Sequence, residues 1–162
     1  MSLNNKRLQF EKTSGTVPVA ERLRLINSTQ RHAVLATVSN GQPYTSLIAF
    51  AMMPDMTNLI FATPKDSSKY RNMIRNRKVA LLIDTRSNSD SAYMKSEAVT
   101  IIGTARPVRR SRKWEEFSAV LLKKHPVLKK FAEAETTALI VVEAEKVFHT
   151  GSFQEVSEWL VR

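Results

Sequence analysis

The stretch between residues 60 and 73 brings together side chains that could hold an anion. Thr63, Ser67 and Ser68 supply hydroxyl groups, and Lys65 and Lys69 supply ammonium groups, where an apolar run gives way to an expected helix. Free backbone N–H groups and the helix dipole favour an anion at a helix N-terminus, and lysine adds a point charge. A phosphate monoester would suit this arrangement.

The same residues also have a purely structural interpretation. Asp66 or Ser67 could simply cap the helix, because both residue types are preferred N-caps, while the lysines extend into solvent. The glycines of a Walker P-loop or of a dinucleotide-binding fingerprint are absent from this stretch. Both interpretations remain open at this point.

Composition excludes several classes of protein. The chain has 162 residues, 43% of them hydrophobic, which is too apolar for a disordered protein. It has no cysteine, so disulfides, thiolate nucleophiles and cysteine-ligated metals are excluded. The three histidines (His32, His125 and His149) are far apart and show no ligand spacing, so we predict no metal site. Without a membrane-spanning run or a signal-peptide core, we expect a cytoplasmic protein.

The net charge of +10 is concentrated in two segments. Residues 65–78 carry a net charge of +5 and residues 106–130 a net charge of +7, so the rest of the chain sums to −2. In the second segment Trp114, Phe117 and Leu121 recur at helical spacing, which indicates an amphipathic helix with a basic face. The alternative is a surface for an anionic substrate, a partner or nucleic acid.

Hydrophobic periodicity predicts the elements that position these residues. We expect one domain over residues 16–162 after a flexible lead-in over residues 1–15. It would be mainly β with α inserts: an antiparallel barrel of six or seven strands with two to four helices. The expected strands cover 33–38, 44–51, 59–63, 79–84, 98–106 and 138–143, with 146–150 an extension or a seventh strand. The expected helices cover 18–29, 67–76, 110–124 and a further turn or two over 127–134.

Three local predictions follow for residues within these elements. Asn40-Gly41 is a strong signal for a two-residue hairpin. Gly103 is a candidate β-bulge. Tyr70 and Ile74 are expected on the apolar side of the helix over 67–76.

Three segments together resemble the pyridoxamine 5′-phosphate oxidase-like family of FMN-binding split barrels. They are GQPYTSLIAF (41–50), IFATPKDSSKYRNM (60–73) and VALLID (79–84). The order of elements also matches, over roughly residues 18–108. The resemblance implies a split barrel, a homodimer and two FMN molecules at the subunit interface.

The resemblance also implies roles for particular residues. Four would lie along the flavin ring, mainly through backbone groups: Ser46, Leu47, Ile48 and Ala49. Two would sit near the ribityl–phosphate end: Ala62 and Thr63. Three would hold the phosphate: Ser67, Ser68 and Lys69. No catalytic side chain is assigned, because the flavin itself carries the hydride.

The chain departs from the vitamin B6 oxidases of this family at several positions. Those enzymes carry arginine at the position of Ser46, lysine at Ala51, arginine at Ser68 and glutamine at Ala98. The resemblance therefore implies a flavin-dependent oxidoreductase acting on an unidentified small molecule rather than an orthodox B6 oxidase. One alternative is a flavin- or haem-binding protein without turnover, and a second is a basic nucleic-acid-binding barrel, the least favoured.

Overall fold

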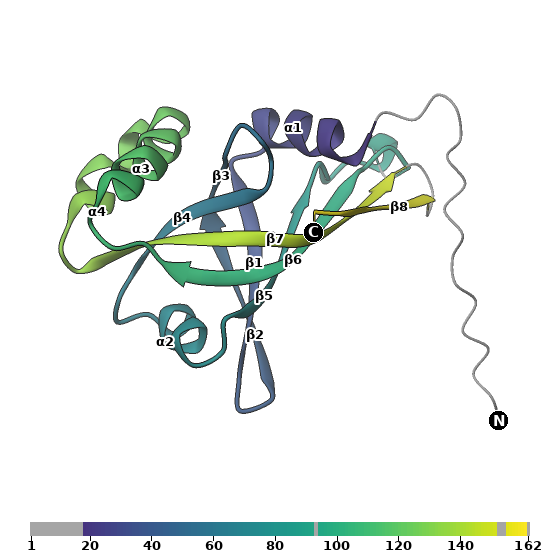
Figure 1. Ribbon diagram of the computed structural model, residues 1–162. Coiled ribbons are helices and arrows are strands. Elements are labelled where there is room, and N and C mark those ends of the chain that lie inside the picture. Colours follow the sequence, from purple (N-terminus) through teal and green to yellow (C-terminus); the bar gives the residue numbers. More distant parts are fainter. Residues whose placement is uncertain (1–17, 93, 152–154, 162) are drawn as a thin grey trace.

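The computed structural model describes residues 18–92, 94–151 and 155–161, so the expected lead-in over 1–15 lies outside the described residues (Figure 1). The helices are α1 (Val19–Thr29), α2 (Ser68–Arg75), α3 (Arg112–Lys124) and α4 (Lys129–Glu133), with short 3-10 helices η1 (Asp90–Ala92) and η2 (Pro126–Leu128). The strands are β1 (His32–Ser39), β2 (Gln42–Ala49), β3 (Ala51–Met52), β4 (Asn58–Pro64), β5 (Lys78–Asp84), β6 (Ala98–Pro107), β7 (Thr137–Gly151) and β8 (Glu155–Leu160).

All strands join one antiparallel sheet in the order β2-β1-β5-β6-β7-β4-β3, with β8 added to β7. The sheet curls around a core that includes Leu35, Phe50, Phe61 and Ile101, and α1 contributes Leu23 to this core. The mainly β split-barrel prediction with helical inserts is therefore confirmed. Two strands lie outside the expected set: the two-residue β3, and β8, whose burial pattern has no clear alternation.

The local predictions are confirmed with one exception. Asn40 and Gly41 have φ values of 50° and 75°, as the hairpin between β1 and β2 requires. The register of β6 and β7 shifts at Gly103, where β7 inserts Glu145 as an extra residue. The prediction for Ile74 is wrong: it is 50% exposed, because α2 turns Met73 toward the barrel.

A second apolar cluster lies on the other side of β3 and β4. There α3 packs Phe117 and Leu121 against Ala51, Ile60 and Leu139, which confirms the apolar face expected for this helix. The pair α3 and α4 stands at one end of the molecule in Figure 1. This packing places the C-terminal end of α3 beside the junction of β2 and β3.

Candidate functional site

The split in the barrel lies between β2 and β4, which are not neighbours in the sheet. Strand β2 pairs with β1 as far as Ala49, and after Phe50 the chain changes partner, since β3 pairs with β4. If the β3–β4 register continued into β2, Ala49 would face Ala62 and Ile48 would face Thr63. Neither pair forms in the described part of the chain. The facing edges of β2 and β4 therefore keep backbone groups free along the split.

One wall of the split consists of the four β2 residues predicted to follow the flavin ring. Ile48 is buried, Ser46 and Ala49 are half-buried, and Leu47 is 66% exposed. The Ser46 hydroxyl oxygen is itself buried and has no hydrogen-bond partner among the described residues. A buried polar group without a partner is costly, so this hydroxyl suits a ligand that supplies the missing partner.

The other wall is built from β4 and the turn that enters α2. Ala62 is half-buried and Thr63 is buried. The Ser67 hydroxyl donates to the Pro64 carbonyl (2.8 Å) and accepts from the Tyr70 amide (3.3 Å), so the Thr63 hydroxyl, 3.0 Å away, is the donor to Ser67. The capping interpretation is therefore correct for Ser67. The hydroxyls of Thr63 and Ser67 are both engaged within the chain.

The first turn of α2 keeps other donors free. Among the described residues, no acceptor binds the backbone N–H groups of Ser68 and Lys69. The Lys69 side chain is half-buried, and no basic residue of 65–78 forms an ion pair within the described ranges. Free amides, a helix dipole and unneutralised cations together make this end of the split attractive for a phosphate.

Two residues that position α2 escape sequence reasoning. Arg71 binds the Ser68 hydroxyl (3.3 Å) and the Asp66 carbonyl, so it orients the first turn of the helix. Asn72 is buried and donates to the Thr37 hydroxyl of β1 (3.0 Å), which fixes α2 against the barrel. The i,i+3 spacing of Ser68 and Arg71 is a signal that could indicate the first contact; the second joins residues 35 positions apart and has no local signal.

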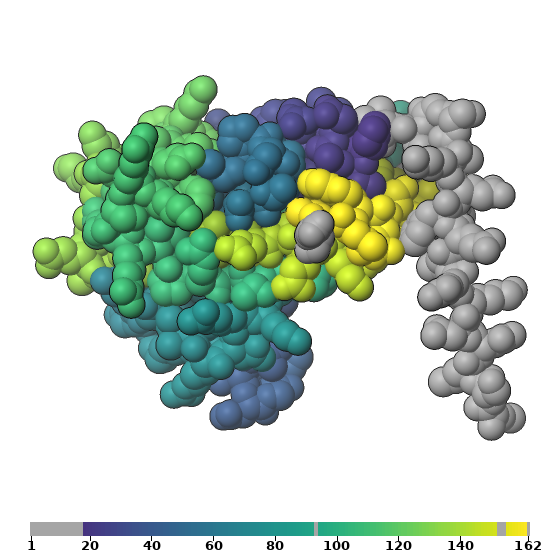
Figure 2. All heavy atoms as spheres, in the orientation of Figure 1, coloured from purple at the N-terminus to yellow at the C-terminus, as the bar shows by residue number. Residues whose placement is uncertain are grey.

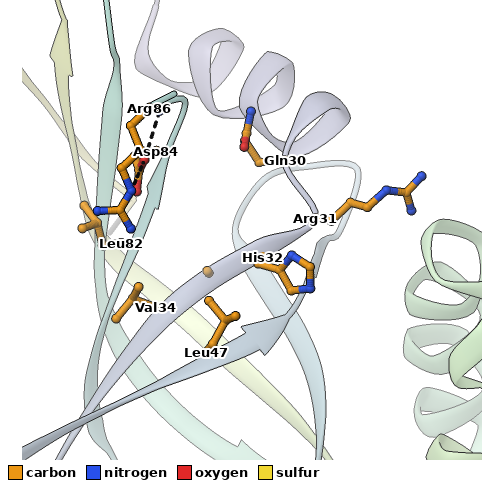
Figure 3. A pocket seen from close by; sticks show the side chains of 9 residues that line it. Gln30, Arg31, His32, Val34, Leu47, Leu82, Asp84 and Arg86 are labelled. Atoms are coloured by element: carbon orange, nitrogen blue, oxygen red, sulfur yellow. Dashed lines mark hydrogen bonds and ion pairs between the residues drawn. The ribbon is translucent and has the colours of Figure 1, made fainter. Parts of the chain in front are cut away.

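Beside the split, the outer face of the sheet carries a short apolar strip bordered by polar and charged side chains. Leu47, Val34 and Leu82 are register partners on β2, β1 and β5, and they lie next to one another (Figure 3). They border a shallow pocket of about 200 Å³ that is also lined by Asp84 and Arg86, which form an ion pair at 3.1 Å. This pocket is smaller than the roughly 300–1,000 Å³ that usually encloses a small ligand.

The three histidines lie in separate environments. His32 is exposed, His125 donates from Nε2 to the Phe50 carbonyl (2.8 Å), and His149 Nε2 lies 3.8 Å from Glu97 Oε2. Burial is the main cause that lowers the pKa of both His125 and His149. Over the described ranges, no three acidic or histidine side chains gather in a group that could hold a metal.

The sequence profile of the pyridoxamine 5′-phosphate oxidase family matches residues 19–151 of this chain. The chain belongs to this family. The match spans both walls of the split and the whole of α2. Among curated protein sequences, none matches the chain. No helix among the described residues is long and apolar enough to cross a membrane.

Several solved structures share the fold of this chain. A haem-binding protein from Mycobacterium smegmatis superposes with a TM-score of 0.79 at 17% identity, covering 90% of this chain and 59% of that one. HutZ, the haem storage protein from Vibrio cholerae, superposes with a TM-score of 0.72 at 15% identity, covering 86% of this chain and 100% of that one. A FAD-binding protein from Mesorhizobium loti superposes with a TM-score of 0.63 at 18% identity, covering 87% of this chain and 95% of that one. At these identities the similarity shows the fold alone, and the chain spans 59% of the mycobacterial protein.

Proposed function

We propose that this protein binds FMN in the split and is a flavin-dependent oxidoreductase for a small molecule. The observation that carries the proposal is the first turn of α2, where the Ser68 and Lys69 amides have no acceptor among the described residues and Lys69 adds a half-buried cation. The unpaired Ser46 hydroxyl on the opposite wall provides an independent fit to a polar ligand.

In this proposal the chain supplies binding and orientation. The amides of Ser68 and Lys69, together with the Lys69 side chain, would hold the phosphate. The free backbone edge of β2 over Ser46–Ala49 and the Ser46 hydroxyl would hold the ring system. Bound FMN would supply hydride-transfer chemistry. Free backbone donors along an edge need no particular side chain, which is consistent with the mixed residue types at these positions.

The second candidate is a haem-binding protein, because two of the similar structures described above bind or store haem. The phosphate-binding character of α2 favours FMN, since haem carries carboxylates and needs an axial ligand. Of the three histidines, His125 is already bound to a backbone carbonyl and His149 faces Glu97. Only His32, which pairs with Ala49 of β2, is exposed beside the split.

The proposed site is completed by a second copy of the chain. The apolar strip runs from Leu47 through Val34 to Leu82, and Leu47 belongs both to this strip and to the β2 wall of the split. A partner subunit covering this face would bury these side chains and enclose the ligand. The proposal therefore includes a homodimer with FMN at the interface.

Binding of FMN and of riboflavin, which lacks the phosphate, tests the proposal directly. We expect the wild-type protein to bind FMN more tightly than riboflavin. We also expect Lys69→Ala to weaken FMN binding by about 1.5–3 kcal/mol, the range for a charge-assisted hydrogen bond, and riboflavin binding very little. Fluorescence titration gives both dissociation constants.

Lys113→Ala is the matched control, because Lys113 is an exposed lysine on α3. It should leave both dissociation constants unchanged. Equal losses for FMN and riboflavin in Lys69→Ala would show that the phosphate lies elsewhere. A protein that takes up no FMN but develops a Soret band with haemin would support the haem candidate instead.

A further inference from the structure

Phe50 occupies the point at which the split opens. It lies between Ala49, the last β2 residue paired with β1, and Ala51, the first β3 residue paired with β4. It is fully buried in the barrel core. The direction of the chain at Phe50 therefore determines how β2 diverges from β4.

Three groups outside the barrel strands hold Phe50 in place. The His125 imidazole donates from Nε2 to the Phe50 carbonyl at 2.8 Å. The Lys124 ammonium group lies 3.8 Å from the centroid of the Phe50 ring, a cation–π contact. The Phe50 amide donates to the Arg31 carbonyl at 3.3 Å. The carbonyl, the ring and the amide of one residue thus each have a separate partner.

The same contacts tie α3 to the strand junction. Lys124 Nζ also donates to Asn27 Oδ1 (3.0 Å), and the Met52 amide of β3 donates to that same oxygen (3.1 Å). The Arg31 side chain reaches the Lys124 carbonyl at 3.4 Å. Lys124 is half-buried and forms no ion pair with any described carboxylate. A half-buried cation without a counter-ion is costly for folding alone.

We infer that His125 and Lys124 are positioning residues that hold Phe50 and thereby set the separation of β2 from β4 at the flavin-binding split. This inference rests on the proposed function, which names FMN as the ligand. It assigns to the C-terminal end of α3 an effect on a site that it does not touch. The remaining partner of Phe50, the Arg31 carbonyl, lies in the turn before β1. Asn27 of α1 binds Lys124 and the Met52 amide, so α1 holds the junction indirectly.

The surroundings of His125 favour the neutral imidazole, whose Nε2–H can donate a hydrogen bond. Burial lowers the pKa of His125 and the bond to the Phe50 carbonyl opposes the shift, while the charges of Lys124, Arg31 and His32 lower the pKa further. The imidazole is therefore neutral at pH 7, and its Nε2–H is directed at Phe50. Glutamine can place an amide N–H at nearly the same position, whereas leucine cannot.

The test compares His125→Leu with His125→Gln in the full chain. We expect His125→Leu to weaken FMN binding about tenfold, the scale of effect expected from a small misplacement of a binding group. We expect it also to change the visible circular dichroism of the bound flavin. His125→Gln should restore both to near wild-type values. In hydrogen exchange, the peptide over 46–52 should exchange faster in His125→Leu and return toward the wild-type rate in His125→Gln.

Val147→Ala controls for general destabilisation, because Val147 is a fully buried core residue at the β7–β8 end of the sheet. It should lower Tm and leave FMN affinity within about twofold, since Val147 pairs with Ile101 and Trp159 and lies on neither of the strands that form the split. Equal FMN affinity in wild type and His125→Leu, or an equal loss in Val147→Ala, would overturn the inference. If the wild type binds no FMN, the proposed function fails, and the exchange of 46–52 still shows whether His125 holds the junction.

Discussion

Ser67 and Ser68 are neighbours with the same hydroxyl group, yet they have different roles. The Ser67 hydroxyl has both a donor and an acceptor within the chain, whereas the Ser68 backbone amide has no acceptor among the described residues. The sequence places both serines at a helix start, because their spacing is local. The sequence alone does not show that the two serines have different roles, because those roles depend on the geometry of the turn around Pro64. The buried Ser46 hydroxyl is likewise visible only once β2 and β4 are placed.

Lys124 provides a prediction at the scale of a single residue. Burial, with the Arg31 charge as a lesser cause, lowers its pKa from 10.5 to about 8. An amine with that pKa is half neutral at pH 8, whereas an ordinary lysine is under about 1% neutral. We expect the acylation rate of Lys124, followed by mass spectrometry, to rise with a midpoint near pH 8. Because the folded pKa lies below the unfolded one, this group destabilises the fold at neutral pH, and the penalty falls as pH rises from about 8 to 10.5.

Asn27→Asp is the companion variant to this measurement. It places a carboxylate at the position of the amide oxygen that lies 3.0 Å from Lys124 Nζ. An opposite charge at this distance favours the ammonium form, so the labelling midpoint should move up. Lys113, exposed on α3, is the internal reference. The interpretation is wrong if the acylation rate of Lys124 in the wild type shows no midpoint near pH 8.

At the scale of elements, the helices and the hairpin are predictable because their signals are local. The periodic residues of α1 and α3, and Asn40-Gly41, each lie within a short window. Strand β8 is different, because its pattern of exposed and half-buried residues has no alternation and its position depends on pairing with β7. The junction at Phe50 also escapes prediction: the expected strand over 44–51 is one run, and only the structure shows that it changes partner.

The bulge between β6 and β7 gives a prediction for one element. A Cβ atom at Gly103 would collide with the Glu143 carbonyl oxygen, which is backbone and cannot move aside, and would lie 3.1 Å from Val142 Cγ1. We expect Gly103→Ala to reduce the free energy of unfolding by about 3 kcal/mol, the upper part of the range for overpacking. Denaturant titration measures this loss.

Gly41→Asn is the contrasting variant for this experiment. Gly41 has a positive φ of 75°, and no atom of the described residues lies within 4 Å of an added Cβ. Asparagine tolerates such a φ better than most residues, so the loss should stay below about 1 kcal/mol. A Gly103→Ala protein as stable as the wild type would mean that the two strands can separate at the bulge without cost.

At the scale of the whole molecule, the structure shows where the basic segment 106–130 lies and which of its charges are engaged. Figure 2 shows α3 and α4 (green) gathered at one end of the molecule, and the basic segment 106–130 lies in this region. Part of that charge has a structural role, because Arg106 pairs with Glu143 and Arg110 stacks on Trp114. The sequence shows the excess of charge, but only the structure shows which cations are engaged. The aromatic side chains Trp114 and Phe117 pack inward, which does not favour a stacking surface for nucleic acid.

The apolar strip of Leu47, Val34 and Leu82 leads to a prediction about assembly. We expect the protein to have twice its chain mass of 18.4 kDa in solution. Leu82→Glu should raise the dimer dissociation constant by about 100-fold, since a two-fold interface would bury the new charge twice. Sedimentation velocity measures the change. Val127→Glu, at a 91% exposed position next to α4, is the control. A Leu82→Glu protein with the same dimer affinity as the wild type would place the interface on another face.

Strand β7 has a consequence for how the protein folds during synthesis. Its first half pairs with β4, joining Asn58 to Glu143 and Pro64 to Thr137, partners more than 70 positions apart. Its other edge pairs with β6 along almost its whole length. Until the ribosome has released β7, β4 and β6 both expose an unpaired apolar edge, and such edges invite pairing with other chains. We therefore expect docking of β7 to limit the folding rate, and the incomplete chain to be the form most exposed to aggregation and most dependent on chaperones.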